Sequence, residues 1–311
     1  MTGPPGPGRY APSPTGELHV GNLRTALIAW LSARSRGAEF LMRIEDLDSG
    51  RSREKWVDVQ LEELKELGID WDGGLVFQSR RHGLYAEAIE TLRGDGLIYE
   101  CFCTRVEIRE AASAPHGELP EGAYPGTCRD LKDEERKARR AEGRPPALRV
   151  RADAVRMGFE DVVCGRVESV VDDFVVMRND GDYAYNLAVA VDDSAQGIGE
   201  VVRGADLLET TVRQLWLFDK LGLRAPASYA HVPLMLGDDG ARLAKRHGAV
   251  TLEERLAGGQ PLESLVGELA ASVGLCPPGT ETTAQDLVEG FSWDRFGAGL
   301  DSPGSTGNFV G

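Results

Sequence analysis

The sequence predicts an α/β protein in which an inserted α+β domain interrupts a parallel sheet and a small helical part follows it. Three observations support this prediction. Strand-like and helical patterns alternate early in the 311-residue chain, the alternation resumes after about residue 180, and the composition between the two parts is different. With 41% hydrophobic residues, the chain can bury a sizeable core without help from disulfides.

The first part of the chain has the pattern of a βαβ unit. Short strands are expected at residues 9–11 and 40–44. Between them, apolar residues at 23–31 repeat with helical spacing, which predicts a helix running to about Arg36. Loop 12–19 leads into that helix, where free N–H groups and the helix dipole attract phosphate. The pattern therefore favours a Rossmann-type parallel sheet with a nucleotide site at this loop.

The next part of the chain changes character. Two helices are expected at 54–67 and 80–93, each followed by a glycine. From 96 to 180 the chain contains clustered cysteines, a highly charged stretch at 130–144 and several short runs typical of strands. We interpret this segment as an inserted domain.

The α/β pattern resumes after the insertion. The apolar run 186–191 predicts a strand buried on both faces, 206–221 a helix capped by Asp206, and 231–236 another strand. The Pro- and Gly-rich start and the small, polar end are typical of loose tails. The predicted division is a first α/β half at 1–95, an insertion at 96–180, a second α/β half at 181–240, and a basic loop, small helical region and flexible tail at 241–311.

Charge and composition limit the classes of function. Fifty acidic against 35 basic residues give a formal net charge of -15, so a nucleic-acid partner must bind at a local basic patch. No apolar run approaches the roughly 20 residues of a membrane-spanning helix. The first residues also lack the basic, then apolar, pattern of a secretory signal. We therefore expect a cytoplasmic protein, and we expect it to be a monomer.

The first motif is R-Y-A-P-S-P-T-G-E-L-H-V-G-N, at 9–22. Gly16 and Gly21 allow the backbone to approach a ligand, and His19 comes just before a helix, where it can donate to a phosphate oxygen. Arg9 supplies a fixed charge suited to a carboxylate. Alternatively, the Pro and Gly residues only shape a turn and His19 lies on the surface.

The full motif resembles the ATP-binding "HIGH" segment of class I aminoacyl-tRNA synthetases, in the form used by glutamyl-tRNA synthetases. The resemblance implies that ATP is a substrate and that His19 is catalytic. Together with the basic loop described below, it implies ATP-binding residues at Pro12, Thr15, Gly16, His19, Gly21, Asn22, Arg242, Leu243 and Lys245.

The second motif is L-M-R-I-E-D-L-D-S, at the end of the second predicted strand. Strand ends in open α/β sheets face the ligand crevice, so Glu45 is suited to hold an ammonium group, although a solvated acidic loop is an alternative. A guanidinium can bind a glutamate side chain through two parallel hydrogen bonds. The resemblance to glutamyl-tRNA synthetases implies a glutamate pocket formed by Arg9, Ala11, Ser13, Glu45, Tyr185 and Arg203.

The third motif is R-L-A-K-R, at 242–246. Lys245 can neutralise charge that grows on the phosphates as pyrophosphate leaves, although a basic pentapeptide is also typical of a solvated surface. The position resembles that of the "KMSKS" loop of the same family and implies a catalytic role for Lys245. The sequence differs from that pattern at Arg242, Ala244 and Arg246, which replace the first lysine and both serines.

The fourth motif combines Cys101, Cys103, Tyr124 and Cys128. Three thiolates and a phenolate can complete tetrahedral zinc and leave no open position, which indicates a structural site; unliganded cysteines are the alternative. The same order of residues resembles the insertion of glutamyl-Q tRNA(Asp) synthetases, a family of shortened paralogues of the glutamyl-tRNA synthetase core. Like them, the chain is too short after the basic loop for helical anticodon-binding domains.

The resemblance implies a two-step reaction. Glutamate attacks the α-phosphate of ATP with Mg²⁺ present, and the glutamyl adenylate is then transferred to the queuosine base of tRNA(Asp). Three alternatives stay open at this point. They are a short glutamyl-tRNA synthetase that charges tRNA(Glu), a small-molecule nucleotidyltransferase that uses His-x-Gly-x at a helix start, and a noncatalytic zinc-containing binding protein.

Overall fold

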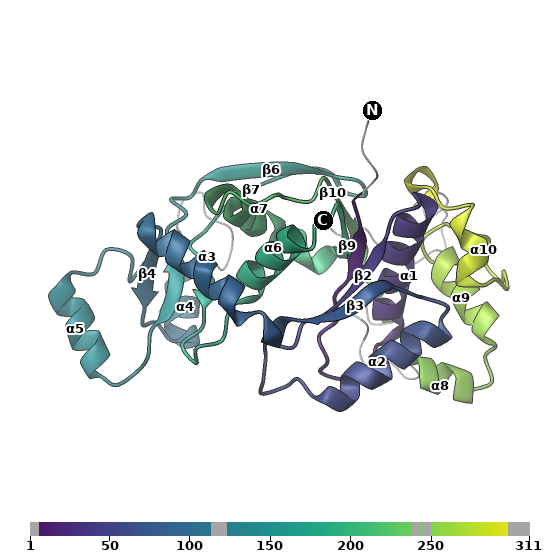
Figure 1. Ribbon diagram of the computed structural model, residues 1–311, viewed down its shortest axis with the longest axis horizontal. Helices are drawn as coiled ribbons and strands as arrows, with labels where there is room; N and C mark the ends of the chain where they lie inside the picture. The colour runs from purple at the N-terminus through teal and green to yellow at the C-terminus, as the bar shows by residue number, and fades with distance from the viewer. Residues whose placement is uncertain (1–5, 113–122, 238–242, 244–249, 298–311) are drawn as a thin grey trace.

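The computed structural model describes residues 6–112, 123–237, 243 and 250–297 (Figure 1). Strand β1 (Gly8–Tyr10) pairs in parallel with β2 (Phe40–Ile44), and helix α1 (Val20–Ser35) connects them. Apolar and small side chains bury most of α1 in the larger hydrophobic core. The predicted βαβ unit is therefore confirmed, with element ends within one residue of the expected ones.

Two sheets, each containing parallel strands, lie edge to edge. β3 (Asp72–Phe77) extends the first sheet, and β9 (Glu200–Gly204) pairs in parallel with β10 (Ser228–Val232) in the second. β1 lies beside β9, and Gly6 and Gly199 approach so closely that a Cβ on either would come within 2.7 Å of the other's Cα. The combined order β3-β2-β1-β9-β10 is that of a Rossmann-type sheet, whose ligand crevice opens at the switch between β1 and β9.

The two helices expected after β2 are confirmed. α2 (Glu54–Glu66) precedes β3, and α3 (His82–Gly94) follows the short 3-10 turn η1 (Gln78–Arg80). Each helix buries one apolar stripe, and α2 also buries two polar residues whose role is described with the site.

The segment 96–180 contains an antiparallel sheet of its own and a hairpin that leaves it. The small sheet has the order β4-β5-β8, whereas the β6–β7 hairpin pairs with β10 of the larger sheet, so the main sheet gains two strands from this segment. The elements of the segment are β4 (Ile98–Cys101), α4 (Arg105–Ala112), α5 (Asp133–Ala141), β5 (Ala147–Val150), β6 (Arg156–Asp161), β7 (Gly165–Val170) and β8 (Val175–Met177).

The strand predicted at 186–191 is wrong, because these residues lie in the helix α6 (Tyr185–Ala195). An apolar run that is buried on all sides does not alternate, so its pattern fits a buried strand and a buried helix equally. Here α6 packs against α3 and α7 (Thr211–Lys220). The helical backbone also brings the buried Asp192 and Asp193 to several arginines.

The elements that follow α6 differ from the prediction at their ends. Asp206 lies in the separate 3-10 turn η2 (Ala205–Leu207) and not at the N-cap of α7, which is Thr210. The strand predicted at 231–236 begins earlier, as β10, and ends at Val232. Residues 233–235 therefore form a loop at the carboxyl end of the sheet.

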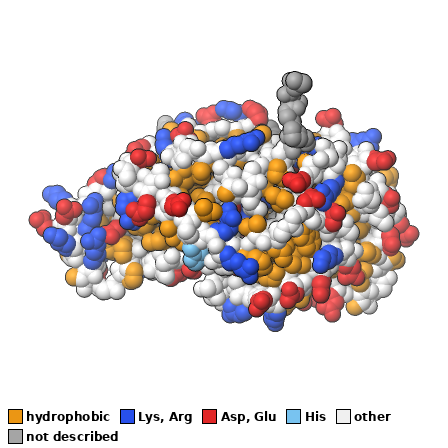
Figure 2. Space-filling view, in the orientation of Figure 1, with side chains coloured by type: hydrophobic (Ala, Val, Ile, Leu, Met, Phe, Trp, Pro, Cys, Tyr) orange, Lys and Arg blue, Asp and Glu red, His pale blue; other side chains and the backbone are white. Residues whose placement is uncertain are grey.

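A helical part ends the described chain. α8 (Leu252–Ala257), α9 (Leu262–Ala271), α10 (Ala284–Val288) and the turn η4 (Trp293–Arg295) lie at the α1 side of the molecule, opposite the end formed by α5 (Figure 1). Figure 2 shows Lys and Arg side chains, mixed with acidic ones, gathered at the α5 end. Within the described residues, no helix is long and apolar enough to cross a membrane.

Candidate active site

One cavity of about 590 Å³ opens where β1, β9 and β10 end and α1 begins. It brings together the predicted ATP and glutamate residues outside the basic loop. Of that loop, Arg242 and Lys245 lie outside the described residues, and Leu243 is described but does not line the cavity. The predicted residues that line the cavity are Arg9, Ala11, Pro12, Ser13, Thr15, Gly16, His19, Gly21, Asn22, Glu45, Tyr185 and Arg203.

His19 is the N-cap of α1. Its Nδ1 accepts a hydrogen bond of 3.1 Å from the backbone N–H of Asn22, so a neutral imidazole carries its proton on Nε2. Gly21 allows the ring to fold over the first turn, because a Cβ at this position would lie 3.0 Å from two ring atoms of His19. The result is a donor held at a helix N-terminus, a geometry suited to a phosphate oxygen.

Two buried residues of α2 support the loop before α1. The side-chain amide of Gln60 donates to the carbonyls of Ser13 (3.1 Å) and Gly16 (2.6 Å), and the Glu63 carboxylate accepts from Leu18 N at 3.0 Å. Neither side chain is among the site residues predicted from the sequence. The available signal was their spacing, because Gln60 and Glu63 share the face of α2 that also contains Val57 and Leu64.

Burial raises the pKa of Glu63 to about 7, helped by Glu17 and Glu253, although the Leu18 N–H lowers it. The folded chain thus holds this proton more tightly than the unfolded one, and the corresponding stability is lost as pH rises from about 4.5 to about 7. At pH 8, we expect the free energy of unfolding of the Glu63→Gln variant to exceed that of wild type by about 1 to 2 kcal/mol. Near pH 5 this difference should disappear.

Denaturant unfolding at pH 5 and pH 8 measures this difference. The exposed neighbour Glu62 provides the control, because Glu62→Gln removes a carboxylate from the solvent-facing side of the same helix. A Glu63→Gln chain no more stable than wild type at pH 8 would show that Glu63 ionises without cost.

Arg9 and Arg203 are both buried; the exposed fraction of the residue is 4% for Arg9 and 5% for Arg203. Arg9 donates to both carboxylate oxygens of Asp193, at 3.3 and 3.4 Å, so its charge is compensated within the protein. Arg203 donates instead to Thr211, Gln214 and His231, all neutral acceptors. Among the described residues Arg203 has no ion pair, and its charge is therefore available to a ligand carboxylate.

Glu45 lines the same cavity, with 9% of its side chain exposed. Burial raises its pKa, although Arg43 and Arg9 oppose the shift. The fully buried Arg43 forms ion pairs with Glu45 at 3.2 Å and with Asp193 at 2.6 Å. Arg43 therefore links Glu45 to Asp193, the carboxylate that also pairs with Arg9. Arg43 belongs to the second motif but is not among the site residues predicted from the sequence. Tyr185, at the start of α6, lines the same cavity and is 37% exposed.

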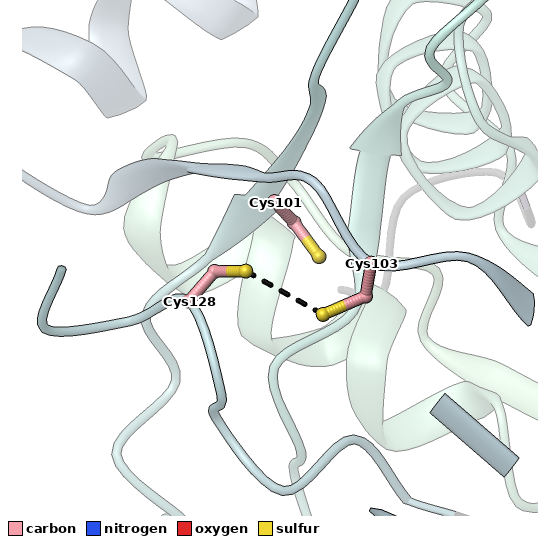
Figure 3. A group of neighbouring side chains, drawn as sticks. All are labelled: Cys101, Cys103 and Cys128. Atoms are coloured by element: carbon pink, nitrogen blue, oxygen red, sulfur yellow. Dashed lines mark hydrogen bonds between the residues drawn. The ribbon is translucent and has the colours of Figure 1, made fainter. Parts of the chain in front are cut away.

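Cys101, at the end of β4, Cys103 and Cys128 point toward one another (Figure 3), with their sulfur atoms all within 4.8 Å of one another. Cys103 Sγ lies 3.5 Å from Cys128 Sγ, and Tyr124 Oη lies 3.5 Å from the sulfurs of Cys101 and Cys103. Tetrahedral zinc thiolates place sulfurs about 3.8 Å apart. The donor set therefore fits zinc.

The comparison with family models decides the class of protein. Residues 7–281 match the model described as "tRNA synthetases class I (E and Q), catalytic domain". The chain belongs to this class I tRNA synthetase family.

Individual relatives within this family are similar over most of the chain. A glutamyl-Q tRNA(Asp) synthetase of Nocardia farcinica is 57% identical, over 88% of this chain and 86% of its own. One of Symbiobacterium thermophilum is 46% identical over 93% of both chains. The crystal structure of a glutamate tRNA ligase from Elizabethkingia meningosepticum, in complex with its amino acid, superposes with a TM-score of 0.78 at 26% identity. The match covers 93% of this chain but 65% of that ligase.

Proposed function

We propose that the chain is a ligase that activates L-glutamate with ATP and transfers the glutamyl group to the queuosine base of tRNA(Asp). The observation that carries the proposal is the single cavity. A class I synthetase ATP-binding segment, a buried guanidinium without an ion pair among the described residues, and the Glu45 carboxylate, with 9% of its side chain exposed, all line it. The names of the relatives from Nocardia and Symbiobacterium support queuosine as the acceptor.

Activation requires positioning and charge stabilisation more than covalent chemistry from the protein. The α-carboxylate of glutamate attacks the α-phosphate of ATP in line, while Glu45 holds the ammonium group and Arg203 the side-chain carboxylate. His19 and the amides at the start of α1 stabilise the spreading phosphate charge. Lys245 is proposed to act on the departing pyrophosphate, with Mg²⁺ supplying further positive charge.

A second cavity, of about 780 Å³, supports a nucleotide acceptor. It shares Ser13, Glu45 and Tyr185 with the first cavity, so an acceptor bound there would reach a glutamyl adenylate. The protein is acidic overall, but the lining of this cavity is rich in arginine, which is suited to phosphodiester groups. The arginines are Arg51, Arg144, Arg149 and Arg178.

A structural zinc ion belongs to the same proposal. Cys101, Cys103, Cys128 and Tyr124 would hold it, and four protein ligands would leave no position for substrate. The zinc ion would fix the turn that follows β4, where Cys101 and Cys103 lie. These two cysteines also border the second cavity, so the ion would stabilise the wall of that cavity. The cytoplasmic location and the monomeric state expected from the sequence stay predictions.

His19→Ala should lower the rate of glutamyl adenylate formation by about 100-fold and change the Kd of glutamate less than threefold. The reason is that the imidazole contacts phosphate charge that grows in the transition state, whereas glutamate binds at the other end of the cavity. Single-turnover kinetics and equilibrium binding measure the two quantities separately. An alanine variant with a normal single-turnover rate would remove His19 from the mechanism.

The acceptor is tested with labelled glutamate and tRNA isolated from cells that can or cannot make queuosine. Label on tRNA(Asp) only when queuosine is present is the expected result. Label on tRNA(Glu) irrespective of queuosine would identify a short glutamyl-tRNA synthetase, the second candidate, which the similarity to a solved glutamate tRNA ligase favours. No label on any tRNA would leave the nucleotidyltransferase alternative.

A further inference from the structure

A buried chain of hydrogen bonds lies behind Arg203. Arg203 on β9 is the direct cross-strand neighbour of His231 on β10, and its Nε–H donates to His231 Nε2 at 3.0 Å. His231 Nδ1 lies 2.6 Å from Asp161 Oδ2. His231 and Asp161 are 0% and 3% exposed. The chain therefore runs Asp161, His231, Arg203 and ends at the cavity wall.

The geometry determines the tautomer of the histidine. Since Asp161 is held as an acceptor by backbone N–H groups of Val163 and Cys164, both at 2.9 Å, Nδ1 of His231 carries the proton. Nε2 must then be an acceptor, as the Arg203 donor requires. Burial and the nearby Arg203 lower the pKa of His231 despite Asp161, which keeps the ring neutral.

The remaining contacts fix the rest of the guanidinium. Arg203 Nη1 donates to Gln214 Oε1 at 2.8 Å, and Nη2 donates to Thr211 Oγ1 at 2.7 Å. The Gln214 amide nitrogen donates to Asn186 at 3.2 Å, so its oxygen faces Arg203. A guanidinium has five N–H donors, and these three bonds leave two for a ligand carboxylate in a fixed orientation.

We propose that Asp161 and His231 are positioning residues that set the orientation of Arg203 and thereby the preference for glutamate over glutamine. This inference rests on the proposed glutamate activation. Asp161 comes from the β6–β7 hairpin of the segment 96–180, so the inserted segment contributes to amino-acid selection through the sheet. A ligand amide would present an N–H to the fixed guanidinium donors, whereas a carboxylate presents two acceptors.

The test changes which ring nitrogen of His231 carries the proton. In Asp161→Asn the oxygen can keep the backbone donors, but the new NH₂ faces Nδ1 and forces the proton to Nε2, toward Arg203. In His231→Gln the amide oxygen takes the place of Nε2 and still accepts from Arg203. The double variant should therefore behave like His231→Gln and rescue the damage of Asp161→Asn.

Glutamate-dependent exchange of pyrophosphate into ATP without tRNA provides the readout. We expect Asp161→Asn to raise the KM of glutamate about 10- to 100-fold and to reduce the preference over glutamine, with kcat and the KM of ATP changed less than about threefold. His231→Gln and the double variant should stay within about threefold of wild type. His231→Asn, which keeps only the bond to Asp161, should resemble Asp161→Asn and serves if that variant does not fold.

Each outcome separates the two proposals. A wild-type enzyme without glutamate-dependent exchange would overturn the proposed function itself. With an active wild type, unchanged glutamate KM in Asp161→Asn and His231→Asn would overturn the positioning role. Equal damage in His231→Gln and His231→Asn would do so too, because it would show that the ring only fills the core.

Discussion

Arg203→Gln should lower kcat/KM for glutamate activation by about 100- to 1000-fold and abolish most of the preference for glutamate over glutamine. The guanidinium is 5% exposed, and its protein partners are neutral hydrogen-bond acceptors. A substrate carboxylate would therefore be its counter-ion. Glutamine at this position retains polarity but loses the charge, so the substrate carboxylate would be buried without compensation.

The measurement is pyrophosphate exchange with each amino acid, at saturating ATP. The KM of ATP should change little, because the ATP-binding segment lies at the start of α1. Arg166→Gln is a matched control, since Arg166 lies on the exposed face of β7 with 59% of its side chain accessible. An Arg203→Gln enzyme that still selects glutamate would transfer the carboxylate-binding role to another residue.

If the proposed zinc ion is bound, Cys103→Ser should remove it and loosen the small sheet. A serine hydroxyl is a poor replacement for a thiolate, and binding of structural zinc is coupled to folding. We expect the zinc content to fall from about one to below about 0.1 per chain, and amides of β4 and β5 to exchange at least about 100-fold faster. Transfer to tRNA should suffer more than tRNA-free activation, because Cys101 and Cys103 border the second cavity and do not line the first.

Cys276→Ser is the control, because Cys276 lies outside the cysteine cluster and its thiol donates to the Gly267 carbonyl at 3.4 Å. Elemental analysis and hydrogen exchange measure the two effects. A purified wild-type chain that is folded, active and free of zinc would refute the metal assignment, whatever Cys103→Ser does.

Local sequence patterns predicted the part of the fold that forms the nucleotide end of the site. The residues of β1, the loop, α1 and β2 are adjacent in sequence. The apolar residues of α1 recur at helical spacing and are buried in the larger core. Glu45, Arg9 and His19 could be placed in one cavity from this pattern and from the resemblance to known synthetases, because strand ends and a helix start meet there.

The residues that the sequence did not reveal act through distant partners. Arg43 and Asp193 are 150 positions apart, and His231 and Asp161 are 70 apart. When a buried arginine or histidine lies in a strand, the neighbouring sequence does not indicate which distant residue it pairs with. The helix α6 was missed for a related reason, since Leu187 to Val191 are buried by elements on every side and show no period.

In the proposed reaction, the cavity at the β1 and β9 strand ends couples glutamate to adenosine monophosphate. Isotope exchange between pyrophosphate and ATP, measured without tRNA across the amino acids, follows this coupling step alone. We expect exchange that depends on glutamate and is at least about 100-fold weaker with glutamine or aspartate. Exchange that is absent with glutamate, or equally strong with glutamine, would contradict the proposed reaction.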